Sequence, residues 1–177
     1  MDRRGEPQGG WENVDTECRG GDEPTGVVEP EVTTPMVMQY AHRLAPTPEA
    51  HVEPDGDTYV NVPNNFFADA EDVDHTVTLF GQPITISFQV SDVTWQFGDG
   101  STARGRGVEN ADVGQPGAVE HAYTRQGGYD VTATTSITVV FTLPGGQTVT
   151  RANAITTSSH PVTVPVGEIQ TTVNDVG

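Results

Sequence analysis

The chain has 177 residues, enough for one ordinary domain with a tail or at most two small domains. Apolar residues make up 34% of it, and 25 acidic against 8 basic residues give a formal net charge of −17. A charge this negative repels phosphate, which argues against nucleic acid and anionic lipid as partners and leaves cations and basic proteins open. The single cysteine, Cys18, excludes an intramolecular disulfide.

Residues 1–57 are predicted to be a flexible acidic segment and linker. Thirteen of the 25 acidic residues lie within residues 1–60, where Gly and Pro are frequent and apolar runs are short, so ordering entropy would not be offset by burial. Residues 36–44 are compatible with a short helix between prolines, and residues 45–57 read as an extended linker. The first residues lack the apolar segment of a signal peptide, and no run of 18 apolar residues predicts a membrane span.

From Thr58 onward the pattern is that of short strands. Residues 59–62 predict a strand, Asn64-Asn65 a turn, and residues 69–74 an acidic loop. A period of two then runs through residues 84–90 and, after a short turn, through residues 93–97. The longest alternation is Tyr129–Thr142, followed by a Pro-Gly-Gly hairpin turn into residues 148–157 and a last strand at residues 162–166.

About seven strands and no strong helix predict an all-β sandwich or barrel. We therefore place the boundary of the folded domain at residue 58, so that residues 58–177 form the β-sandwich. Within it, the segment Trp95-Gln96-Phe97-Gly98-Asp99-Gly100-Ser101 is the most informative stretch. The two aromatic residues point the same way and supply core, the glycines permit unusual backbone angles, and Asp99 can accept backbone N–H bonds that hold the turn.

This segment resembles the signature of the PKD (polycystic kidney disease) domain, Trp-x-Phe-Gly-Asp-Gly-Ser. The family also has a His-x-Tyr segment and a Gly-x-Tyr-x-Val-Thr strand, and this chain has His121-Ala122-Tyr123 and Gly128-Tyr129 in the corresponding order. The resemblance covers residues 76–166 and implies an immunoglobulin-like β-sandwich outside the cell. The stretch Tyr59–Phe67 is similar to a segment that precedes the PKD domain in a group of actinobacterial exported proteins, and the absence of Lys fits that resemblance.

No catalytic motif is visible, and the five histidines lack metal-site spacing. The expectation is therefore a protein without enzymatic activity or a resident cofactor. Most of the carboxylates lie in the acidic tail and in loops, which indicates solvated charge and not the rigid pair that a glycosidase needs. Calcium is the cation that the acidic clusters would suit, because it prefers clustered carboxylate and carbonyl oxygens. The main candidate ligands are Asp69, Glu71, Asp72 and Asp74, and a second acidic group is Glu53, Asp55 and Asp57.

The resemblance implies a non-catalytic module at the cell surface that acts as a spacer or contacts a protein or polysaccharide. Two alternatives stay open: a structural accessory of a surface assembly such as a pilus, and an accessory domain of a secreted hydrolase. A partner could also add a strand to an exposed sheet edge. Neither the partner nor the oligomeric state follows from the sequence.

Overall fold

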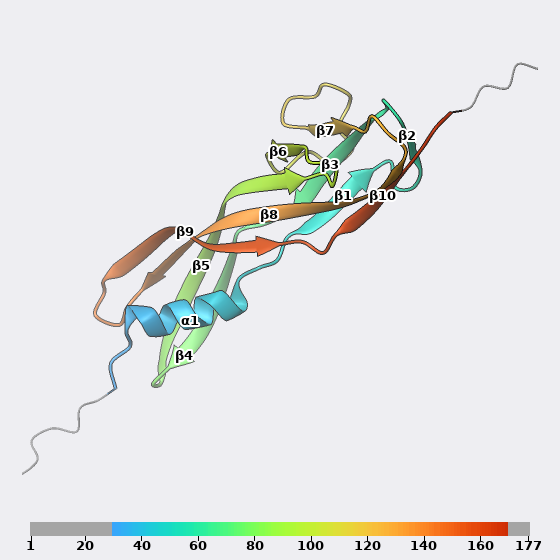
Figure 1. Ribbon diagram of the computed structural model, residues 1–177. Coiled ribbons are helices and arrows are strands. Elements are labelled where there is room, and N and C mark those ends of the chain that lie inside the picture. The colour runs from blue at the N-terminus through green and yellow to red at the C-terminus, as the bar shows by residue number, and fades with distance from the viewer. Residues whose placement is uncertain (1–29, 170–177) are drawn as a thin grey trace, which may run out of the picture. The chain divides into compact units, whose positions relative to one another are not determined.

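The computed structural model describes residues 30–169, in which one compact unit begins at Glu31. This part of the chain contains a single helix and ten strands (Figure 1). Their bounds are α1 (Thr34–Leu44), β1 (Glu49–Glu53), β2 (Thr58–Tyr59), β3 (Pro63–Asp69), β4 (Val73–Leu79), β5 (Gln82–Gln96), β6 (Thr102–Arg104), β7 (Val119–Ala122), β8 (Gly127–Thr142), β9 (Thr148–Ser158) and β10 (Val162–Gly167). The prediction of an all-β, immunoglobulin-like β-sandwich is confirmed.

Two sheets make up the fold. The smaller sheet has the order β1-β3-β7, and all its neighbours are antiparallel. The larger sheet has the order β2-β10-β8-β5-β4, with β6 added to β5 and β9 added to β8. The long central strands β5 and β8 run side by side through most of the larger sheet (Figure 1).

A β-bulge at Ser91 keeps the apolar face of β5 on one side of the sheet. Before it, Ile86 and Phe88 pair with Phe141 and Val139 of β8; after it, Trp95 pairs with Ala133. The buried positions of β5 change from even to odd numbers across the bulge, whereas those of β8 stay odd throughout. The sequence pattern predicts a turn between two strands here. The structure has one strand of 15 residues, because an extra residue changes the parity without ending the ladder.

The same face of the larger sheet carries two apolar clusters. One lies between the sheets and includes Phe66, Trp95, Phe97 and Tyr123, all at most 1% exposed. The other lies on the half of the sheet that contains β4, β9 and the adjoining parts of β5 and β8, and it includes Val37 and Ala41 of α1. The smaller sheet therefore covers one half of this face and α1 contributes the cover of the other half.

The folded part begins earlier than the predicted boundary at residue 58. Residues 34–44 form α1, which agrees with the suggested helix, and residues 49–53 form β1 where the sequence predicts a linker. Val37, Ala41 and Ala50 are at most 7% exposed, so this segment supplies part of both cores. The sequence does not reveal this role, because the segment is rich in acidic residues and proline and buries few apolar residues. The remainder of the predicted flexible segment, residues 1–29, lies outside the described residues.

Three further local predictions are wrong. The predicted strand at residues 59–62 is limited to β2 (Thr58–Tyr59), the predicted acidic loop at residues 69–74 contains the end of β3 and the start of β4, and the predicted turn at Asn64-Asn65 is part of a strand. Asn64 and Asn65 lie inside β3 and not in a turn, since both are paired with β7 and both are at least 91% buried. The Gly- and Arg-rich stretch after β6 folds back onto β3. There the amide of Ala68 donates to the carbonyl of Arg106, and Asn65 Nδ2 donates to the carbonyl of Val108.

Candidate functional site

The aromatic residues of the Trp-x-Phe-Gly-Asp-Gly-Ser segment form the centre of the core between the sheets. Trp95 and Phe97 are 0% and 1% exposed, with ring planes 5° apart and centroids 6.5 Å apart. The indole Nε1 donates a hydrogen bond of 2.9 Å to the carbonyl of Gly105, which satisfies its one polar group. The prediction that Trp95 is a core residue agrees with this burial.

Asp99 holds the turn that follows, as the sequence predicts. Its Oδ1 accepts the backbone N–H of Ser101 at 2.8 Å, and the Phe97 amide donates to the Ser101 carbonyl at 3.1 Å. Gly98 and Gly100 have φ angles of +79° and +94°, the left-handed region that favours glycine. The turn therefore depends on both glycines and on the carboxylate between them.

His121 of β7 closes the turn from the other sheet. Its Nε2 lies 2.8 Å from Asp99 Oδ2, and its ring stacks on Phe97 at 4.3 Å with planes 7° apart. Burial raises the pKa of Asp99, but the hydrogen bonds from Ser101 and His121 and the charge of His121 outweigh burial and leave that pKa below its ordinary value. The carboxylate is thus ionised and fully engaged by the fold.

Tyr123 and Tyr129 complete the cluster. The Tyr123 hydroxyl donates to the carbonyl of Phe97 at 3.1 Å, and its ring stacks on Tyr129 at 4.3 Å. Burial, together with the negative charge of Asp99 and the neighbouring Tyr129, raises the pKa of Tyr123. Gly128, the remaining predicted motif residue, lies in β8 opposite Pro165 of β10.

The motif residues thus come together from β5, β7 and β8, but they make structural contacts. Asp99, Ser101 and His121, which have the residue types of a catalytic triad, line a surface hollow together. Ser101 directs its hydrogen bonds to Asp99, from both the backbone and the side chain. A nucleophilic serine would instead bond to the histidine, so this arrangement orders a turn and does not activate a hydroxyl.

The four predicted calcium ligands do not form one group. Asp72 accepts the amide of Val90 at 2.8 Å and pairs with Arg106 at 3.6 Å. Asp69 ends β3 and lies 3.3 Å from His51 Nε2. Glu71 lies between β3 and β4, and Asp74 lies within β4 opposite Ser87. Of the second acidic group, Glu53 accepts hydrogen bonds from Asn65 Nδ2 and the Asn110 amide.

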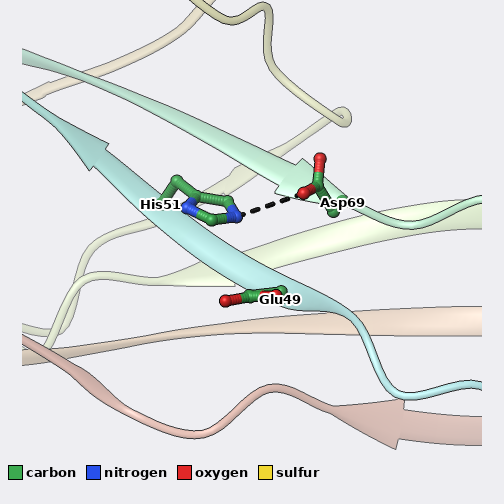
Figure 2. A group of neighbouring side chains, drawn as sticks. All are labelled: Glu49, His51 and Asp69. Carbon is green, nitrogen blue, oxygen red and sulfur yellow. Dashed lines mark ion pairs between the residues drawn. The ribbon is translucent and has the colours of Figure 1, made fainter.

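Within residues 30–169, one group of three side chains lies close enough together to hold a metal ion: Glu49, His51 and Asp69, whose ligand atoms all lie within 4.8 Å of one another (Figure 2). Sequence reasoning missed Glu49 and His51. Their spacing of two places them on one face of a strand, and this signal was available in the sequence. It was overlooked because the segment was interpreted as a linker.

Residues 70–139 match the family model of the PKD domain. The match spans β4 to β8 as far as Val139, and so includes the motif segment, His121, Tyr123 and Tyr129. No curated protein matches the chain. The resemblance of Tyr59–Phe67 to actinobacterial exported proteins lies upstream of the matched segment and stays a prediction.

Proposed function

We propose that this chain is a non-catalytic PKD-type module that acts outside the cell as a spacer and as a contact surface for a protein or polysaccharide. The observation that carries the proposal is the use of the motif's polar groups. His121 of β7 is hydrogen-bonded to Asp99 and stacks on Phe97, and the Tyr123 hydroxyl donates to the Phe97 carbonyl, so these groups join the two sheets. PKD domains commonly serve as such modules outside cells. The one described helix, α1, is too short to cross a bilayer.

The contact surface that we favour is the hydroxyl-rich face of the larger sheet, opposite the two apolar clusters. Hydrogen bonds between threonines join neighbouring strands there: Thr76 with Thr85 at 3.1 Å, and Thr142 with Thr148 at 3.0 Å. These side chains are exposed, and strands in a sheet repeat at about 4.8 Å, so the hydroxyls form a regular polar array. Such an array suits a partner rich in hydroxyl or amide groups.

The test uses the full chain with insoluble peptidoglycan and chitin as probes. We expect a saturable bound fraction with one of them and no release of soluble sugar or peptide fragments. Thr85→Glu should reduce the bound fraction, whereas Thr102→Glu, an exposed threonine on β6, should not. Release of fragments that disappears with Asp99→Asn would instead establish a hydrolase, and equal binding by both glutamate variants would exclude the threonine face.

A second candidate, a component of a surface assembly, is favoured by the outer edge of β4. This strand ends the order of the larger sheet and pairs over all seven of its residues with β5, without a register shift. In contrast, β9 has a register shift opposite Ile137 to Val139 that interrupts its ladder. A regular unpaired edge is suited to strand addition.

Sedimentation velocity over a range of concentrations tests this candidate. Strand addition between copies predicts a mass that increases with concentration and returns to that of the monomer in Thr76→Lys, because an edge lysine opposes pairing. A mass that stays that of one chain at all concentrations excludes self-assembly through β4.

A further inference from the structure

We propose that Glu49, His51 and Asp69 form a binding site for a divalent transition metal of the zinc type, a property that goes beyond the proposed contact function. The three residues lie on the face of the β1-β3-β7 sheet that is turned away from the core between the sheets, since the alternate residues Ala50 and Ala68 belong to that core. Figure 2 shows the imidazole directed toward Asp69, with Glu49 beside it on the same strand.

The backbone brings the two carboxylates together. Glu49 and Asp69 are direct cross-strand partners in the antiparallel pair of β1 and β3. Like charges in that position destabilise a sheet. In the part of the chain that the structure describes, the His51 imidazole lies beside the two carboxylates and can offset this repulsion. A bound dication would attract both carboxylates and so replace the repulsion by attraction.

His51 is oriented as a ligand. Its ring stacks on Phe67 of β3, with centroids 4.7 Å apart and planes 12° apart, which fixes the direction of Nε2. Nε2 is buried and lies 3.3 Å from Asp69 Oδ2, but the alignment is not that of a hydrogen bond, and no described group is its hydrogen-bond partner. A buried imidazole nitrogen without a partner is costly, and coordination would use its lone pair.

The donor set selects the kind of metal. One imidazole nitrogen and two carboxylate oxygens are three ligands of the type that zinc takes at roughly 2.0–2.2 Å, with water at the fourth position. Calcium requires six to eight oxygen ligands, and an imidazole is not among its usual donors. The ligand atoms, now within 4.8 Å of one another, need to approach by about 1 Å for tetrahedral coordination. The carboxylates have room for this, since the Asp69 side chain is 70% exposed.

Metal at this position would join the edge strand β1 to β3. In the smaller sheet, β1 has one strand neighbour, so a bond across the pair adds to the attachment of the segment that carries α1 and β1. The expected consequence is a folded unit whose thermal stability increases with zinc concentration.

Isothermal titration of the full chain with zinc chloride at about pH 8 tests the site, in a Cys18→Ser background so that the thiol does not contribute. We expect one equivalent of zinc to bind and the Tm to increase by roughly 5 °C or more at a hundredfold excess over Kd. His51→Gln should weaken zinc binding about tenfold or more. The matched control is His75→Gln, which replaces a β4 histidine whose ring packs against Phe88, and this variant should bind zinc as the parent does.

Glu49→Gln separates the metal site from a purely structural ion pair. If the two carboxylates repel each other in the metal-free protein, this variant has a higher Tm without metal, and zinc raises its Tm by less than it raises that of the parent. If His51 instead serves as a cationic partner of both carboxylates, the same variant has a lower Tm without metal, and the proposal fails. Unchanged zinc binding in His51→Gln, or tighter binding of calcium chloride than of zinc chloride, would equally overturn it.

Discussion

Gly98 and Gly100 flank Asp99 in the same turn, yet substitution of alanine should affect them very differently. Both have left-handed φ angles, +79° and +94°. A Cβ on Gly98 would lie 2.8 Å from the carbonyl oxygen of Asp130 and 3.0 Å from its nitrogen, both backbone atoms of β8. A Cβ on Gly100 would meet nothing within 4 Å. The pair therefore separates backbone strain from a collision with the core sheet.

The expected losses follow from these two causes. A left-handed alanine costs about 1–2 kcal/mol at either position. Only at Gly98 must β5 and β8 also move apart, which as an overpacking effect costs about 1–3 kcal/mol more. We thus expect the free energy of unfolding to fall by roughly 2–5 kcal/mol in Gly98→Ala and by roughly 1–2 kcal/mol in Gly100→Ala. At about 3 °C per kcal/mol, the Tm should decrease by roughly 6–15 °C and 3–6 °C.

Urea unfolding followed by tryptophan fluorescence measures the difference, because Trp95 is fully buried in the core that the turn closes. Equal losses in the two variants would refute the close approach of Gly98 to Asp130. A loss confined to Gly100→Ala would refute the geometry of the whole turn.

Three more predictions concern the same core. Because the pKa of Tyr123 is raised from its ordinary 10.0, the neutral hydroxyl stabilises the fold below about pH 10, and this stability is lost as the pH rises further; Tyr123→Phe should flatten the alkaline decline in Tm, and an unchanged decline would contradict the assignment. The pKa of Asp99 is lowered, so its contribution is present above about pH 4 and is lost as the pH falls through the folded-state value. Asp99→Asn should therefore be less stable than the parent at neutral pH, and its free energy of unfolding, measured by urea titration, should fall less than that of the parent as the pH is lowered. Deletion of Ser91 should abolish cooperative unfolding in calorimetry, because either Phe88 or Trp95 must then point to the solvent side of β5; a deletion variant that melts normally would show that the bulge is dispensable.

The alternation of the sequence correctly places strands at residues 84–90, 129–142, 148–157 and 162–166, which lie in β5, β8, β9 and β10. Residues 84–90 and 129–142 divide into apolar and hydroxyl-bearing sets because one face of the larger sheet is buried and the other is solvated. The motif segment likewise identifies Trp95 and Phe97 as core and Asp99 as the residue that holds the turn. These features depend on local periodicity and turn chemistry, which are properties of neighbouring residues in the chain.

The helix and first strand were only partly predictable. Residues 36–44 carry a helical signal, but nothing local shows that Val37 and Ala41 cover the sheet that contains Ile86 and Phe141. Segment 49–53 reads as linker because its acid content suggests solvation. Its pairing with β3 more than ten residues later supplies the backbone hydrogen bonds that make it a strand.

What the sequence by itself determined is therefore the class of fold, the alternation of buried and exposed residues in the long strands, and the residues that match the PKD signature. Only the tertiary structure decided that one extra residue at Ser91 keeps two cores on one face, that His121 closes the Asp99 turn, and that Glu49 and Asp69 meet across a strand pair. The physical reason is that periodicity reports which face of an element is buried. The register between strands far apart in the chain, which brings particular polar groups together, is set by the packing of the whole unit.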